Sequence, residues 1–239
     1  MTFKKEADFE KELIHLLTSV SGWKKDTCGW GNSDGAYESV LRYPDEEDLL
    51  KNWANILYNN NKSRDRLNEY PLTSGEMRQI MEQVTNLRTP LKLNGFINGR
   101  SVSIVRDNPE DTEHLGKEIS LKLFDRMEIA GGQSVYQIAQ QPKFPAKNRI
   151  LNDRRGDVML LINGMPVIHI ELKRSGVPVS EACHQIEKYS HEGVFTGLFS
   201  LVQIFVAMTP EETLYFANPG PDGRFNPSFY FHWADFNNE

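Results

Sequence analysis

Hydrophobic positions recur along this chain with two different periods, which predict a mixture of helices and strands. Apolar residues spaced three and four apart predict amphipathic helices over residues 5–20, 45–58, 73–87 and 179–191. Short alternating or continuous runs rich in Val, Ile and Leu predict strands over residues 102–105, 119–124, 135–139, 201–207 and 213–217. The pattern therefore predicts an α/β protein in which helices flank a mixed β-sheet.

Residue types at the helix ends sharpen two of these boundaries. Thr73, followed three residues later by Glu76, is the pattern of a capping box and predicts a helix start. Pro90 predicts the end of that helix, because proline lacks the backbone N–H that a helix interior needs. The helix after Pro44 opens with acidic residues, which the helix dipole favours at an N-terminus.

The stretch GDVMLLINGMPVIHIELK, residues 156–173, carries the strongest candidate chemistry. Two apolar runs flank Asn163-Gly164, which predicts a β-hairpin. Successive side chains of a strand point to opposite faces, so His169, Glu171 and Lys173 share one face of the second run. The apolar side chains between them face a core.

Whether Asp157 reaches Glu171 depends on how the hairpin pairs. With a two-residue turn and regular pairing, Asp157 lies opposite Ile170, on the other face from Glu171. A three-residue loop or a β-bulge restores the parity and brings both acids to one face. A site that contains both acids therefore requires an odd-length loop or a bulge, and we predict one of the two.

Two neighbouring carboxylates and a lysine favour phosphodiester hydrolysis. Adjacent carboxylates repel each other unless a cation lies between them, and hard oxygen ligands suit magnesium or manganese. Lys173 can stabilise the charge of a phosphoryl transition state. The same residues also fit an exposed strand face with scattered charges. His169 is interpreted as a neutral residue of that face.

Composition narrows the class of protein. The 239 residues are 39% hydrophobic, enough for one large or two small domains, and the net charge is -6. Residues 143–174 contain seven basic and three acidic residues, a net of +4 against -10 elsewhere, which suits a phosphate backbone. Two distant cysteines predict neither a disulfide nor a zinc site. Without a signal sequence, an apolar span or a P-loop, the chain is expected to be soluble and cytoplasmic, with no membrane contact.

Three motifs in order carry a family resemblance. Asp157, the triplet Glu171-Leu172-Lys173, and Gln185 followed by Tyr189 resemble the PD-(D/E)xK nuclease superfamily. More narrowly, they resemble the N-terminal endonuclease domain of type I restriction enzyme R subunits. The phrases ADFEKELIHLL, INGMPVIHIELK, SLVQIFVAM and LYFANP are similar to that family over nearly the whole chain.

The resemblance implies roles for individual residues. It makes Asp157 and Glu171 metal ligands, aided by the Leu172 carbonyl, and makes Lys173 the catalytic lysine. A glutamate of the first helix would complete the pocket; Glu10 is the better match, and Glu12 is the alternative. The residues expected to engage DNA are Gln185, Tyr189 and Arg174. The chain departs from the pattern at Gly156, where many relatives have proline, at an expected small cost because glycine can take the same conformation.

The resemblance also implies a setting for the reaction. The expected fold is the restriction-endonuclease-like core, with a nuclease domain over residues 1–225 and the start of a linker to translocase domains over 226–239. The expected cofactor is Mg²⁺, for which Mn²⁺ can substitute, while ATP would act only in domains beyond this chain. The expected partners are double-stranded DNA and the methyltransferase and specificity subunits. Two alternatives remain: a standalone repair or modification-dependent nuclease, and a non-catalytic DNA-binding or docking module.

Overall fold

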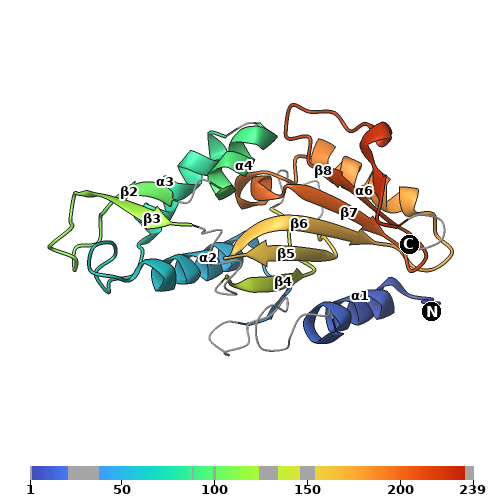
Figure 1. Ribbon diagram of the computed structural model, residues 1–239, viewed down its shortest axis with the longest axis horizontal. Coiled ribbons are helices and arrows are strands. Elements are labelled where there is room, and N and C mark those ends of the chain that lie inside the picture. Colours follow the sequence, from blue (N-terminus) through green and yellow to red (C-terminus); the bar gives the residue numbers. More distant parts are fainter. Residues whose placement is uncertain are drawn as a thin grey trace.

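A seven-stranded mixed β-sheet forms the centre of the molecule (Figure 1). The computed structural model describes residues 2–20, 38–87, 89–98, 101–123, 134–145 and 154–234. In spatial order the strands are β1 Val40–Arg42, β4 Tyr136–Gln140, β5 Val158–Ile162, β6 Met165–Leu172, β7 Ile204–Met208, β8 Thr213–Ala217 and β9 Phe231–His232. Among these described strands, β1–β4 and β6–β7 pair in parallel and the other neighbours pair antiparallel. The expected mixed α/β architecture is confirmed.

The β5–β6 hairpin contains both a two-residue turn and a bulge. Ile162 pairs with Met165, and Asn163 and Gly164 both have positive φ, at 50° and 83°. The register then shifts, because Leu161 pairs with Pro166 whereas Leu160 pairs with Ile168. The bulge expected from the chemistry is therefore confirmed, and the alternative three-residue loop is wrong.

Helices cover both faces of the central strands. Helix α1 (Glu6–His15), continued by the π-helical turn Leu16–Val20, packs through Phe9 on the face that carries Ile170 and Leu172. The opposite face packs against α2 (Glu46–Asn61), α6 (Val179–His191) and the 3-10 helix Gly197–Leu201. Both faces of β6 are consequently buried, and Glu171 and His169 have 0% exposure. The reading of β6 as an exposed polar strand face is wrong.

A smaller part lies at one end of the sheet, in the left half of Figure 1. It consists of α3 (Ser74–Thr85), α4 (Pro90–Asn98) and the antiparallel pair β2 (Ser101–Val105) and β3 (Glu118–Lys122). Its centre is the fully buried Arg106, whose guanidinium donates to Glu76 Oε2 at 2.7 Å and to Asp111 Oδ2 at 2.9 Å. Two buried carboxylates thus tie α3 to the segment that follows β2.

Several predicted boundaries hold and some do not. Helix α6 spans the predicted residues, and Thr73 and Glu76 form the expected capping box at the start of α3. Pro90 does not stop α3, which has its C-cap at Asn86; Pro90 instead begins α4, where its missing N–H costs nothing.

The C-terminal part of the described chain still belongs to the sheet. Strand β9 pairs with β8, so the sheet extends beyond the expected domain boundary at residue 225, and residues 235–239 lie outside the described ranges. Cys183 is a buried free thiol, and Cys28 lies outside the described residues. Across the part of the chain that the structure describes, no helix combines the length and apolarity that a membrane crossing requires.

Candidate active site

The bulge in β6 brings Asp157 and Glu171 to one face of the hairpin. Asp157 immediately precedes β5, and Val158 pairs with Ile170, so the next step of the ladder sets Asp157 opposite Glu171. The Leu172 backbone N–H donates to Asp157 Oδ2 at 2.7 Å, which ties the aspartate to the end of β6. The two acids predicted to meet therefore do meet.

Burial dominates the electrostatics of this pair. Loss of solvent and, secondly, the negative charge of Glu171 together raise the pKa of Asp157 to about 8. Loss of solvent likewise raises the pKa of Glu171, to about 7, against the opposing effect of the Lys173 charge. The pair therefore retains a proton near neutral pH unless another cation takes its place.

Lys173 follows the acids and points back at them. Its Nζ donates to the Leu172 carbonyl at 2.9 Å and lies 3.7 Å from Glu171 Oε1. Its backbone N–H donates to the Met208 carbonyl at the end of β7, which fixes the direction of the chain here. The ammonium is thereby held beside the carboxylates from a rigid strand end.

The α6 residues of the third motif contact the site from the helix. Gln185 Nε2 donates to Glu171 Oε1 and lies 2.8 Å from the Tyr189 hydroxyl. Tyr189 is buried, and its hydroxyl donates to the Arg155 carbonyl at 3.0 Å. These side chains hold Glu171 and the backbone before Asp157, so any effect of Tyr189 on DNA would pass through the Arg155 segment.

Glu10 reaches the site through two glutamines that the sequence reading did not single out. Its buried carboxylate accepts from Gln140 Nε2 at 2.6 Å and from Gln141 Nε2 at 3.1 Å. Adjacent strand side chains normally diverge, but Gln141 has a φ of 48°, which breaks the alternation. The Gln141 N–H also donates to the Asp157 carbonyl at 2.7 Å. This network links Glu10 to the strand end beside Asp157, whereas Glu12 is only half-buried. Of the α1 glutamates, Glu6 acts on the site itself, because its negative charge raises the pKa of Glu171.

The His169 ring lies against the acids. It is fully buried, and burial lowers its pKa to about 4, so the ring is neutral. Its Nε2 lies 3.3 Å from Glu171 Oε2. The ring faces a core and not solvent, so it does not belong to an exposed strand face.

The basic segment is only partly described. Arg154 makes a two-pronged contact of 2.8 Å with Glu192 and is compensated by it, whereas Arg155 and Arg174 are exposed. Lys147 and Arg149 lie outside the described residues. Of the basic residues here, Arg174 combines exposure with direct adjacency to Lys173.

The donors present fit a small divalent cation. Two carboxylates and the Leu172 carbonyl are hard oxygen ligands of the kind that Mg²⁺ and Mn²⁺ take. Glu171 Oε2 is buried and has no hydrogen-bond partner, as expected of an atom that a cation would contact. Within the described ranges, no cluster of three or more His, Cys, Asp or Glu side chains could hold a metal ion, so water or substrate oxygens would have to complete the shell.

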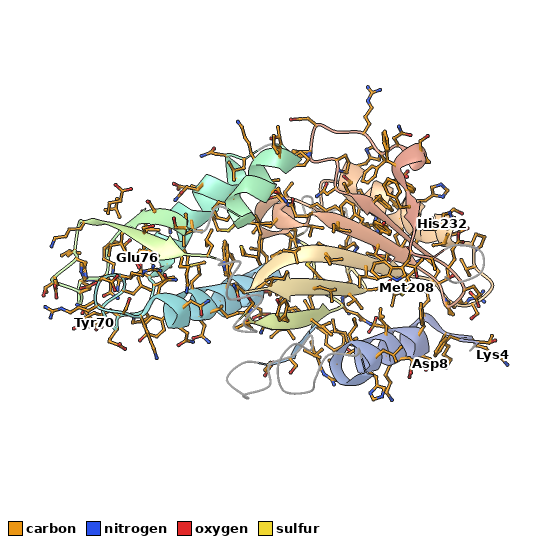
Figure 2. The ribbon with its side chains drawn as sticks, viewed as in Figure 1. Lys4, Asp8, Tyr70, Glu76, Met208 and His232 are labelled. Carbon is orange, nitrogen blue, oxygen red and sulfur yellow. The ribbon has the colours of Figure 1, made fainter. Side chains whose placement is uncertain are left out.

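The site lies near the ends of strands β6 and β7, close to helix α1. Figure 2 labels Met208 at the end of β7, above Asp8 on α1, while Glu76 lies at the far end of the molecule. Met208 also packs into the core cluster that α1 shares with Leu172. The candidate site thus lies between strand ends, away from the part that contains Arg106.

Comparisons with known proteins show the family to which this chain belongs. Residues 3–224 match the family described as type I restriction enzyme R protein N terminus. The chain is 29% identical over its whole length to a type I restriction enzyme endonuclease subunit of Staphylococcus saprophyticus, and 30% identical to one of Staphylococcus aureus. It covers 22% of the length of each. A shorter match, 40% identical over 86 residues, covers 35% of this chain and 28% of the corresponding subunit of Escherichia coli. The chain therefore belongs to the family of type I restriction enzyme R protein N termini.

Proposed function

We propose that this chain is the metal-dependent endonuclease domain of a type I restriction enzyme, and that it hydrolyses phosphodiester bonds of double-stranded DNA. The observation that carries the proposal is the bulged hairpin. It sets Asp157 opposite Glu171, with Lys173 beside them, in a site from which solvent is largely excluded. A nonfunctional hairpin would gain nothing from burying two carboxylates whose pKa values both rise.

Each residue has a role in this proposal. Asp157, Glu171 and the Leu172 carbonyl would hold Mg²⁺, with Mn²⁺ as a substitute. When bound, the ion would neutralise the acids and polarise a phosphoryl oxygen. The Lys173 ammonium would stabilise the negative charge that develops on the phosphate. Gln185 would hold the Glu171 carboxylate through the hydrogen bond to Oε1.

The wider setting of the reaction is proposed from the family. The relatives named above are endonuclease subunits of type I restriction enzymes, which supports an assembly with methyltransferase and specificity subunits. ATP would act in other domains. Exposed Arg174, together with Arg155, would meet the DNA backbone next to the site.

The test is cleavage by the complete restriction assembly. Glu171→Ala and Lys173→Ala should each abolish DNA cleavage while leaving ATP hydrolysis unchanged. Lys188→Ala, at an exposed position of α6, is the matched control and should cleave normally. Cleavage retained by either site variant would refute the assignment. Metal-independent DNA binding without cleavage by the unmodified assembly would instead indicate a docking module.

A further inference from the structure

The His169 imidazole occupies an unusual position for a polar group. It is fully buried, and its ring centroid lies 5.9 Å from that of Phe144, 5.3 Å from that of Phe195 and 6.2 Å from that of Phe205. Among the residues that the structure describes, neither ring nitrogen has a hydrogen-bond partner. Burying an unpaired polar group costs folding free energy, so packing alone would favour an apolar side chain here.

The ring faces Glu171 Oε2, the carboxylate oxygen away from Gln185. Oε1 accepts from Gln185 and lies 3.7 Å from Lys173 Nζ. Oε2 is buried without a hydrogen-bond partner, and His169 Nε2 lies 3.3 Å from it. At this distance a neutral ring that carries its hydrogen on Nε2 can serve as a donor to this oxygen once the two groups are aligned. The His169 ring therefore borders the free edge of the Glu171 carboxylate.

Gly156, the residue before Asp157, leaves room for this ring. A Cβ at position 156 would lie 2.5 Å from His169 Cε1 and 3.1 Å from Phe144 Cζ, closer than packed atoms approach. The Gly156 N–H donates to the Pro142 carbonyl at 3.1 Å, so a proline here would also lose a hydrogen bond. Glycine at 156 and histidine at 169 thus fit each other across the two strands.

We propose that His169 is a positioning residue that orients the Glu171 carboxylate toward the divalent ion, and that the absent side chain of Gly156 admits its ring. The inference rests on the proposed function, because it assigns Glu171 as a metal ligand. It explains why a polar ring is kept among three phenylalanines at a cost in folding.

Manganese affinity of the 239-residue chain separates positioning from packing. Free Mn²⁺ is measured by electron paramagnetic resonance, with Asp157→Asn defining the background. His169→Leu, of similar size but apolar, should weaken binding about tenfold, as loss of a residue that orients a ligand typically does. Its melting temperature should stay the same or rise, because an unpaired polar group is removed. His169→Gln, whose amide nitrogen can take the place of Nε2, should recover most of the affinity.

A double-mutant cycle tests the match with Gly156. Gly156→Ala alone should weaken Mn²⁺ binding, because its methyl group displaces the His169 ring. In a His169→Ala background the space beside residue 156 is vacant, so Gly156→Ala should weaken Mn²⁺ binding much less. Coupling between the two positions is the expected result; equal effects in both backgrounds would overturn the role of Gly156.

The outcomes distinguish this inference from the function on which it rests. If Asp157→Asn weakens Mn²⁺ binding but His169→Leu does not, His169 is a packing residue and the inference is overturned. If Asp157→Asn also leaves Mn²⁺ binding unchanged, the metal site itself is refuted. A weaker affinity in His169→Leu with an unchanged or higher melting temperature supports the inference.

Discussion

The carboxylate pair should make the fold less stable as the pH rises, and Asp157→Asn should remove the part of this effect that Asp157 contributes. Asparagine keeps the size of the side chain. It also keeps an oxygen that can accept the hydrogen bond that the Leu172 N–H donates to Asp157 Oδ2 at 2.7 Å. It removes only the charge that is desolvated beside Glu171. The substitution therefore probes the electrostatic cost of the site with little change in packing.

The magnitude follows from the pKa of Asp157. It is about 8 in the folded chain, against 3.8 for an aspartate in solvent, so between these values the folded chain holds a proton that the unfolded chain has released. The free energy of unfolding therefore falls as the pH rises through this window. At about 1.4 kcal/mol per pKa unit, the cost is about 1–2 kcal/mol at pH 5 and on the order of 5 kcal/mol at pH 8.

Urea unfolding at pH 5 and pH 8 in EDTA measures the effect. Asp157→Asn should stabilise the 239-residue chain at both pH values, with a gain about 3 kcal/mol larger at pH 8. Asp222→Asn, at an exposed aspartate, is the control and should show no such difference. A gain that is equal at the two pH values, or larger at pH 5, would refute the proposed electrostatics.

Two further predictions concern the stability of the fold outside the candidate site. Arg106→Leu removes the guanidinium that pairs with two buried carboxylates and should lower the free energy of unfolding by about 3–5 kcal/mol in urea, without changing Mn²⁺ affinity. Arg64→Ala removes an exposed ion pair and should cost less than about 1 kcal/mol; equal losses would contradict this account. Gly164→Ala places a Cβ 2.8 Å from Trp53 Cα at a φ of +83°, and should lower the melting temperature far more than Gly176→Ala, where φ is +78° but no atom lies within 4 Å. Similar melting temperatures would show that the turn tolerates a side chain.

Local signals account for the elements that the sequence predicted. The apolar spacing of α6 and the Asn163-Gly164 turn depend only on neighbouring residues, so their bounds could be read directly. The need for a bulge followed from requiring Asp157 and Glu171 on one face of the hairpin, but the position of the bulge along the strands did not. Pro166 next to the shifted pairs was a usable signal, because proline cannot donate to a strand ladder and is found at bulges.

Contacts distant in sequence account for what was missed. Glu10 and Gln140 are 130 residues apart, and no local pattern links them. Alternation placed His169 on a polar face, but that face is covered by α6 and three phenylalanines, which the strand alone does not reveal. Pro90 is equally compatible with a helix end and a helix start. In the structure α3 already has its C-cap at Asn86, and Pro90 begins the separate helix α4.

Manganese located by anomalous scattering in crystals of this chain tests the central claim most directly. The account predicts a peak about 2.0–2.4 Å from carboxylate oxygens of both Asp157 and Glu171. The peak should be lost in Asp157→Asn crystals soaked in the same way. Manganese bound elsewhere, with none between these two acids even when DNA is present, would contradict the account.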